Sequence, residues 1–156
     1  MSAPSATAAV TVAAPPGTVY GLITDLEVLA ELADETTAMR WVSGSSATPG
    51  ARFRGNNRNG WRRWSTTCTV TDAASGQTFA FDVSHLGIPI ARWQYDLEAV
   101  ADGCRVTEST WDRRPGWFRL PAELATGVRD RAEANTTHIT ATLGRLKIRA
   151  ESGAAD

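Results

Sequence analysis

Residues 51–112 alternate between large apolar and polar side chains with a period of two, broken only by short turn segments. Since successive side chains of a β-strand point to opposite faces, this pattern predicts an antiparallel meander with one buried and one solvated face. The inward residues are mainly aromatic or branched: Phe53, Trp64, Val70, Phe79, Phe81, Val83, Trp93, Tyr95, Leu97 and Val106. A single helix cannot fill the space inside a curved sheet of this kind, so the pattern favours an apolar pocket.

Turn signals divide this segment into five strands. An Asn-Gly hairpin signal lies in residues 57–60, and further turns are expected at residues 73–77, 86–89 and 101–103. If the last turn is centred on residues 101–102, the position of the turn determines which residues of the two flanking strands lie opposite each other. The expected pairs are Leu97 with Val106, Tyr95 with Glu108 and Trp93 with Thr110.

The flanking segments complete the expected fold. Residues 10–13 form a short first strand, two short helices follow, with Asp25 as the cap of the second, and residues 39–42 add a strand. A long helix is expected over residues 121–147, because inward positions recur every three or four residues: Leu124, Val128, Ala132, Asn135, Ile139, Thr142 and Leu146. The predicted class is α+β, with a curved antiparallel sheet of about seven strands wrapped around the C-terminal helix.

Composition limits the classes of function. A chain of 156 residues fits one domain spanning residues 1–156, with an ordered core at about 8–148 and flexible ends. A formal charge of −1 gives no reason to expect nucleic acid. Cys68 and Cys104 are too few for a disulfide framework or a zinc site, and no nucleotide motif occurs, so neither a metal nor a cofactor is expected. With no evident signal peptide or membrane span, we expect a cytoplasmic monomer or homodimer.

Several stretches resemble a known family. They are AAPPGTVYGLITD, GARFRGNNRNGWRRWSTTCTV, FAFDV, ARWQYDLE and CRVTESTWDRRPGW. Together with the order of elements, they resemble the helix-grip fold of the START-like (SRPBCC) superfamily, in the bacterial branch of polyketide cyclase/dehydrase and lipid-transport proteins, over about residues 8–148. The resemblance implies a cavity for a hydrophobic ligand between the sheet and the C-terminal helix. It implies no shared catalytic motif.

The inward face and the long helix supply the expected ligand contacts. They are Phe53, Trp64, Phe79, Phe81, Val83, Trp93, Leu97, Val106, Thr110, Leu124 and Val128. The floor of the pocket, near Val70, is expected to be apolar. Polar groups are expected toward its entrance, from Asn57, His85, Tyr95, Glu108 and Thr110. A dry floor with a few polar groups suits a lipid, polyketide or aromatic metabolite with one polar end.

Alternate turns of a meander lie at the same end of the sheet, and two of the segments at the expected entrance are unusually apolar. The entrance residues are Leu86, Ile88, Pro89, Trp117 and Phe118. Clustered apolar residues in loops are typical of a binding entrance or a partner surface. The alternative is that they pack as a lid over the end of the core.

The candidate catalytic residues are Glu108, His85 and Tyr95, the first two expected close together on the inner face. A desolvated glutamic acid or a histidine could transfer a proton in enolisation, aldol closure or dehydration of a keto ligand. The alternative is a purely structural pairing. His138 is expected to pack at the edge of the core.

Five arginines crowd one hairpin: Arg52, Arg54, Arg58, Arg62 and Arg63. They form either a solvated face or a basic patch that steers an acyl carrier, a lipid head group or an acidic partner. Three functions therefore remain open. The chain is a carrier of a hydrophobic small molecule, a cyclase or dehydratase, or an interaction protein that uses its lid and arginine hairpin.

Overall fold

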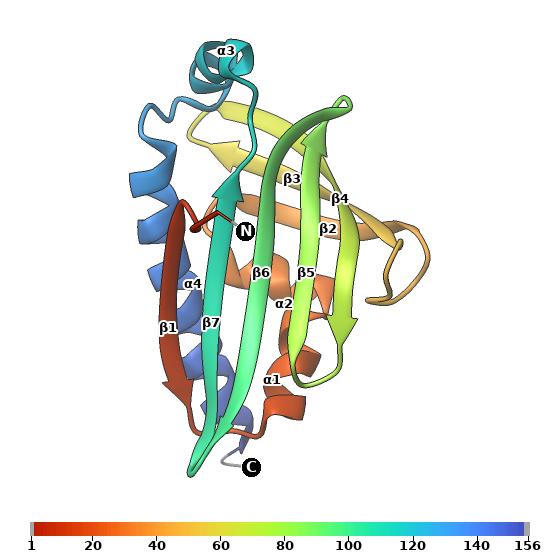
Figure 1. Ribbon diagram of the computed structural model, residues 1–156, viewed down its shortest axis with the longest axis vertical. Helices are drawn as coiled ribbons and strands as arrows, with labels where there is room; N and C mark the ends of the chain where they lie inside the picture. The colour runs from red at the N-terminus through yellow and green to blue at the C-terminus, as the bar shows by residue number, and fades with distance from the viewer. Residues whose placement is uncertain (1, 155–156) are drawn as a thin grey trace.

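A seven-stranded antiparallel sheet curves around one long helix in the computed structural model, which describes residues 2–154 (Figure 1). The strands lie in the order β1-β7-β6-β5-β4-β3-β2, so only the β1–β7 pair joins strands distant in the sequence. The elements are β1 (Ala6–Val12), α1 (Pro16–Ile23), α2 (Leu26–Leu32), β2 (Thr36–Ser43), β3 (Arg52–Asn59), β4 (Arg62–Ala74), β5 (Thr78–His85), β6 (Ile88–Val100), β7 (Gly103–Asp112), α3 (Gly116–Thr126) and α4 (Arg131–Ala154). The expected α+β architecture is confirmed.

The register of the last hairpin is the one that the alternation predicts. Its pairs are Leu97 with Val106, Tyr95 with Glu108 and Trp93 with Thr110. Along β7 the inward positions are buried, including the carboxyl side chain of Glu108. The polarity pattern and the short turn together set this register, because a slip by one residue would turn every inward side chain to solvent.

Two turns are tighter than expected. The β3–β4 turn consists of Gly60 and Trp61, one residue beyond the predicted Asn-Gly pair, with φ +62° at Gly60. The β5–β6 turn consists of Leu86 and Gly87, both with positive φ. The loop predicted over residues 86–89 is therefore wrong in its second half, because Ile88 and Pro89 begin β6. Pro89 is tolerated there beside a register shift in the β5–β6 ladder, where a missing backbone donor costs little.

The single long helix expected over residues 121–147 is wrong, because the chain forms two helices. Gly127 ends α3 in the left-handed conformation with φ +74°, and its amide donates to the Glu123 carbonyl at 2.8 Å. Asp130 then begins α4, since its carboxylate accepts from the Glu133 amide at 2.9 Å. Consequently Leu124 is 70% exposed on α3 and Val128 lies in the link between the helices. Leu124 therefore faces solvent, and Val128, which is half-buried, does not line the cavity, in contrast to what the single-helix pattern required.

The core fills the lower part of the grip, as Figure 1 is drawn, between the sheet, α1 and the C-terminal half of α4. The ring of Phe53 contacts those of Phe81 and Trp41 edge to face, with centroids 5.1 Å and 5.5 Å apart. Ile139 and Leu146 of α4 belong to the same core and are almost completely buried. No helix within residues 2–154 is long and apolar enough to cross a membrane.

Candidate ligand-binding cavity

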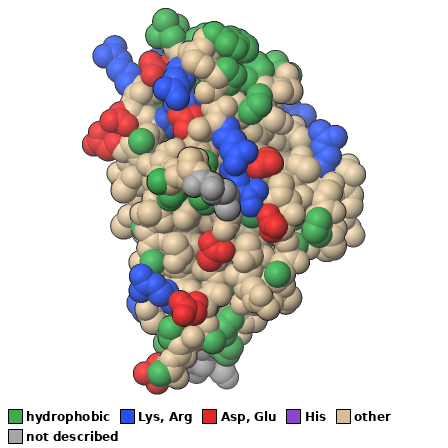
Figure 2. Space-filling model, viewed as in Figure 1, with side chains coloured by type: hydrophobic (Ala, Val, Ile, Leu, Met, Phe, Trp, Pro, Cys, Tyr) green, Lys and Arg blue, Asp and Glu red, His purple; other side chains and the backbone are tan. Residues whose placement is uncertain are grey.

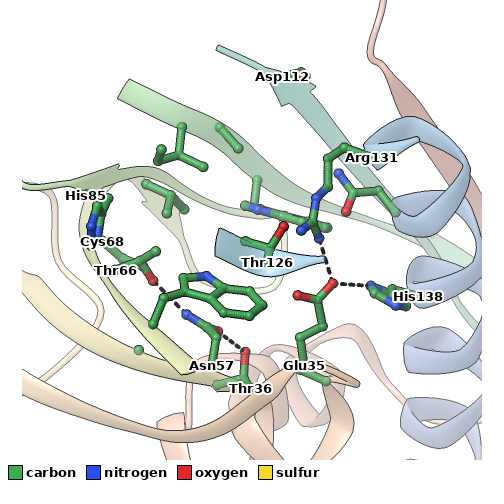
Figure 3. A pocket seen from close by; sticks show the side chains of 18 of the residues that line it. Glu35, Thr36, Asn57, Thr66, Cys68, His85, Asp112, Thr126, Arg131 and His138 are labelled. Atoms are coloured by element: carbon green, nitrogen blue, oxygen red, sulfur yellow. Dashed lines mark hydrogen bonds and ion pairs between the residues drawn. The ribbon is translucent and has the colours of Figure 1, made fainter. Parts of the chain in front are cut away.

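A cavity of about 380 Å³ lies between the concave face of the sheet and the N-terminal half of α4 (Figure 3). Helix α3 contributes Phe118 and Ala122 to its wall, and the segment between α2 and β2 contributes Asp34 and Glu35. The volume is within the range of pockets that hold small organic ligands. The chain therefore has room for a ligand beside a well-packed core.

The structure divides the expected ligand contacts into two groups. Trp64, Phe81, Val83 and Trp93 line the cavity. The others lie outside its wall: Phe53, Phe79, Leu97, Val106, Thr110, Leu124 and Val128. Phe53, Phe79, Leu97 and Val106 are buried in the core, because α1 and the C-terminal half of α4 fill the space that strand alternation alone would leave open. Thr110 is buried beside the cavity, where its hydroxyl donates to the Arg92 carbonyl at 2.9 Å.

Glu108 and Tyr95 form a buried polar pair in the cavity wall. Each side chain is 3% exposed, and Oε2 of Glu108 has no hydrogen-bond partner within residues 2–154. Burial raises the pKa of Glu108 to about 8, although the hydrogen bond with the Tyr95 hydroxyl acts in the opposite direction. Burial also raises the pKa of Tyr95 well above 10, and the neighbouring Glu108 carboxylate adds to this shift. At neutral pH the wall therefore carries a neutral carboxylic acid that keeps one oxygen free.

His85 also lines the cavity, but it does not lie beside Glu108 as predicted. It pairs with Ile88 across the β5–β6 ladder, whereas Glu108 pairs with Tyr95, seven residues further along β6. At roughly 3.3 Å per residue the two positions are about 20 Å apart along the strand. The His85 ring binds locally instead, with Nδ1 2.6 Å from the Ser65 carbonyl oxygen. The predicted proximity of His85 and Glu108 is wrong, because the alternation of side chains shows which face of the sheet a residue lies on but not how far along the strands it lies.

The opposite wall carries an ionic cluster that sequence reasoning missed (Figure 3). Oε1 of Glu35 accepts from Nη1 of Arg131 at 2.6 Å and lies 3.2 Å from Nδ1 of His138. Both α4 residues line the cavity, so His138 belongs to the cavity wall and contacts Glu35, in addition to packing at the edge of the core. The only signal available in the sequence was the seven-residue spacing of Arg131 and His138, which places them on one helix face.

The cations of the cavity wall are neutralised within the chain. Arg131 pairs with Glu35, and Arg114 forms two hydrogen bonds to the Asp112 carboxylate at 2.7 Å and 3.0 Å. Within residues 2–154, no group of three or more histidine, cysteine or acidic side chains has an arrangement that could hold a metal ion. The arrangement suits a mostly uncharged ligand.

The end of the cavity bounded by α3 matches the expected entrance in part. The β3–β4 turn, the β5–β6 turn and α3 gather at one end of the molecule, as predicted (Figure 1). Of the expected entrance residues only Phe118 lines the cavity, whereas Leu86 and Trp117 are exposed, and Ile88 and Pro89 lie in β6. The arginine hairpin holds this end together, since Arg62 Nε donates to the Leu124 carbonyl at 3.2 Å.

Residues 3–151 match the family model described as polyketide cyclase / dehydrase and lipid transport. The chain belongs to this family. A search of curated proteins gives no match. Family membership and the cavity together support a fold that binds hydrophobic ligands, and the family description leaves cyclisation, dehydration and transport open.

Solved structures of similar proteins agree with the fold of this family member. The polyketide-cyclase-like protein Cgl2372 from Corynebacterium glutamicum is 24% identical, with a TM-score of 0.62 over 94% of this chain and 91% of that one. NE0264 from Nitrosomonas europaea is 15% identical, with a TM-score of 0.69 over 96% of both chains. The di-domain ARO/CYC StfQ from the steffimycin biosynthetic pathway is 12% identical, with a TM-score of 0.72 over 96% of this chain and 51% of that one. At these identities the likeness shows the fold alone.

Proposed function

We propose that this protein binds an uncharged, mostly apolar small molecule in the cavity, with a carbonyl or similar acceptor of the ligand placed at Glu108. The observation that carries the proposal is the free, buried Oε2 of Glu108 in a wall built largely from aromatic and aliphatic side chains. A lipid, a polyketide or an aromatic ketone fits this description.

The protonation state of Glu108 determines which polar group fits. A buried carboxyl without a cationic partner stays neutral, because burial penalises the charged form. A neutral carboxyl has one O–H donor. With the Tyr95 hydroxyl bonded to one oxygen of the carboxyl group, the other oxygen carries this donor, buried in the cavity wall, and a ligand that packs against the wall at Glu108 would meet it. A ligand carbonyl or ether oxygen accepts it.

Charged ligands are disfavoured by the same arrangement. A ligand carboxylate finds no unpaired arginine among the lining residues of the part of the chain described, because Arg114 and Arg131 are already paired. A pure hydrocarbon fits the apolar wall but leaves the Glu108 donor unsatisfied, which costs about 1–3 kcal/mol. The expected order of affinity is therefore ketone, then hydrocarbon, then carboxylate.

Three probes of similar shape test this order: acetonaphthone, isopropylnaphthalene and naphthoate, titrated near neutral pH by calorimetry. We expect the ketone to bind about tenfold more tightly than the hydrocarbon. Glu108→Leu should abolish this preference while retaining hydrocarbon binding, and Glu108→Gln, which keeps an N–H donor, should preserve it. If folded protein binds none of the probes, ligand binding itself is contradicted. If ketone and hydrocarbon bind equally well to the unmodified protein, the role of Glu108 is contradicted.

A second candidate is a cyclase- or dehydratase-type enzyme, favoured by a carboxyl whose pKa of about 8 lies near physiological pH in the cavity wall. Glu108 would transfer protons with Tyr95 as a hydrogen-bonding partner, without His85. The structural similarity to an ARO/CYC protein is consistent with this candidate.

Enolisation gives this candidate a direct assay. The protein should accelerate exchange of the methyl protons of acetonaphthone for deuterium, followed by NMR in heavy water. Glu108→Gln should remove the acceleration and leave ketone affinity nearly intact. Tight binding of the ketone without accelerated exchange would exclude Glu108 as an acid–base catalyst for this reaction and leave the binding function.

A further inference from the structure

Large apolar side chains are exposed at the end of the molecule that carries α3. We call them the apical patch, which consists of Trp61, Leu86, Trp117, Leu120 and Leu124. Leu86 is 88% exposed, Trp61 80% and Trp117 69%. Figure 2 shows hydrophobic side chains gathered along this end, whereas polar groups and backbone dominate the rest of the same face. A concentration of this kind is typical of a surface that meets a partner.

Helix α3 has two apolar faces. Phe118 and Ala122 face the cavity, and Trp117, Leu120 and Leu124 follow one another at spacings of three and four on the outside. A helix that covers a core normally turns polar residues to solvent. The outward stripe on α3 is therefore not explained by closure of the cavity.

Unpaired cations surround the apical patch. Arg58, Arg63, Arg113 and Arg119 are exposed and form no ion pair within residues 2–154. The Asp112 carboxylate in the same region is already neutralised by Arg114. Glu123 on α3 forms no ion pair within residues 2–154 and offsets one of the four arginines, so the region keeps an excess of positive charge. A complementary surface would accept apolar side chains and supply negative charge beside them.

We propose that the apical patch docks the protein onto a lipid bilayer that contains anionic lipids. Tryptophan favours the level of the head groups, leucine favours the acyl boundary beneath, and arginine is attracted to anionic head groups. The patch is made of two turn tips and one helix side that project from the end of the sheet (Figure 1), which suits insertion into a soft interface better than contact with a rigid protein groove.

Docking in this orientation places α3 between the bilayer and the cavity. The outer face of the helix contacts lipid while its inner face contacts the cavity, so an apolar ligand could pass without crossing bulk water. The docking itself does not depend on which ligand the cavity binds.

Vesicle sedimentation tests the proposal. We expect the protein to sediment with vesicles of phosphatidylcholine and phosphatidylglycerol, to sediment far less with phosphatidylcholine alone, and to detach as salt is raised. The triple variant Trp117→Ser, Leu120→Ser, Leu124→Ser should lose at least tenfold in partitioning. Ile148→Ser is the matched control, because Ile148 is also 69% exposed but lies toward the C-terminal end of α4.

Three results would overturn the docking. They are absence of binding to anionic vesicles by the unmodified protein, an equal loss in Ile148→Ser, and binding that is insensitive to lipid charge. Urea denaturation checks that each variant is folded. If the triple variant changes self-association measured by analytical ultracentrifugation, and the unmodified protein ignores vesicles, the patch binds a second copy of the chain instead.

Discussion

The substitution Glu108→Gln should stabilise the protein above mildly acidic pH and should remove a pH dependence that the unmodified protein shows. Folding raises the pKa of Glu108 from 4.5 to about 8. The folded state therefore holds this proton more tightly than the unfolded chain. The stability that Glu108 contributes is complete below its unfolded pKa of 4.5 and is lost as pH rises to about 8.

The magnitude follows from the shift. One pKa unit corresponds to about 1.4 kcal/mol, so the free energy of unfolding falls by about 5 kcal/mol between pH 4.5 and about 8. At pH 7, about 3 kcal/mol of this loss has already occurred. Glutamine has nearly the same shape and stays neutral at every pH. The variant should match the unmodified protein near pH 4.5 and exceed it increasingly from there to pH 8.

Urea denaturation across this pH range measures the effect. The difference between the two stability curves isolates Glu108, because every other titrating group is common to both proteins. Glu98→Gln is the matched control, since Glu98 lies on neighbouring β6 but is exposed. Tyr95→Phe should leave the start of the decline unchanged and extend its end to higher pH, because the lost hydrogen bond lowers the pKa of Glu108 in the folded protein. If the free energy of unfolding depends on pH in the same way in Glu108→Gln and in the unmodified protein, Glu108 is not a buried acid that stays neutral in the folded state.

Further substitutions test the packing of the chain by urea denaturation. Phe53→Ala should lower the free energy of unfolding by about 3–5 kcal/mol, because Phe53 is fully buried. Leu124→Ala should change it by no more than about 0.5 kcal/mol, because Leu124 faces solvent. Similar losses in the two variants would contradict the two-helix arrangement. Gly127→Ala should destabilise by about 1–2 kcal/mol, since φ is +74°, whereas Gly144→Ala should stabilise α4 by up to about 1 kcal/mol. Glu35→Gln should cost about 1–2 kcal/mol and accelerate amide hydrogen exchange in the first turns of α4; unchanged exchange would show that the ionic cluster does not hold the helix.

The sheet could be predicted closely because its information is local. Alternation gives each side chain its face, and a two-residue turn then fixes the register, so the pairing of Tyr95 with Glu108 followed directly from the sequence. Whether an inward side chain lines a cavity or lies in the core depends on where α4 packs. No spacing in the sequence encodes that position, so alternation predicts Phe79 and Val106 as ligand contacts although both lie in the core.

The break between α3 and α4 could have been predicted, because the sequence carries a signal for it. Asp130 and Glu133 have the spacing of a capping box, and Gly127 precedes them at the place where a helix commonly ends. A glycine inside a helix costs only about 1 kcal/mol, so Gly127 alone does not reveal the break. The ionic cluster of Glu35 with Arg131 had no comparable signal, since its partners are far apart in the sequence.

The break at Gly127 gives α3 and α4 separate anchors. The first turns of α4 are held by the contacts of Glu35 with Arg131 and His138. The C-terminal end of α3 is held by the β3–β4 hairpin, where Nδ2 of the Asn59 side chain donates to the Thr126 carbonyl at 2.7 Å and Nε of Arg62 donates to the Leu124 carbonyl at 3.2 Å.

Rotation of α3 about residues 127–130 would therefore break the two hydrogen bonds from the hairpin and leave the packing of α4 intact. Glycine is favoured at this point by its positive φ of +74°, and a Cβ at residue 127 would also lie 2.9 Å from the Arg62 guanidinium, so that this flexible side chain would have to shift. An arginine of the basic hairpin thus fastens the helix that bounds the cavity. The sheet and α4 build most of the cavity wall, and α3, held by its hairpin contacts, completes the wall at one end.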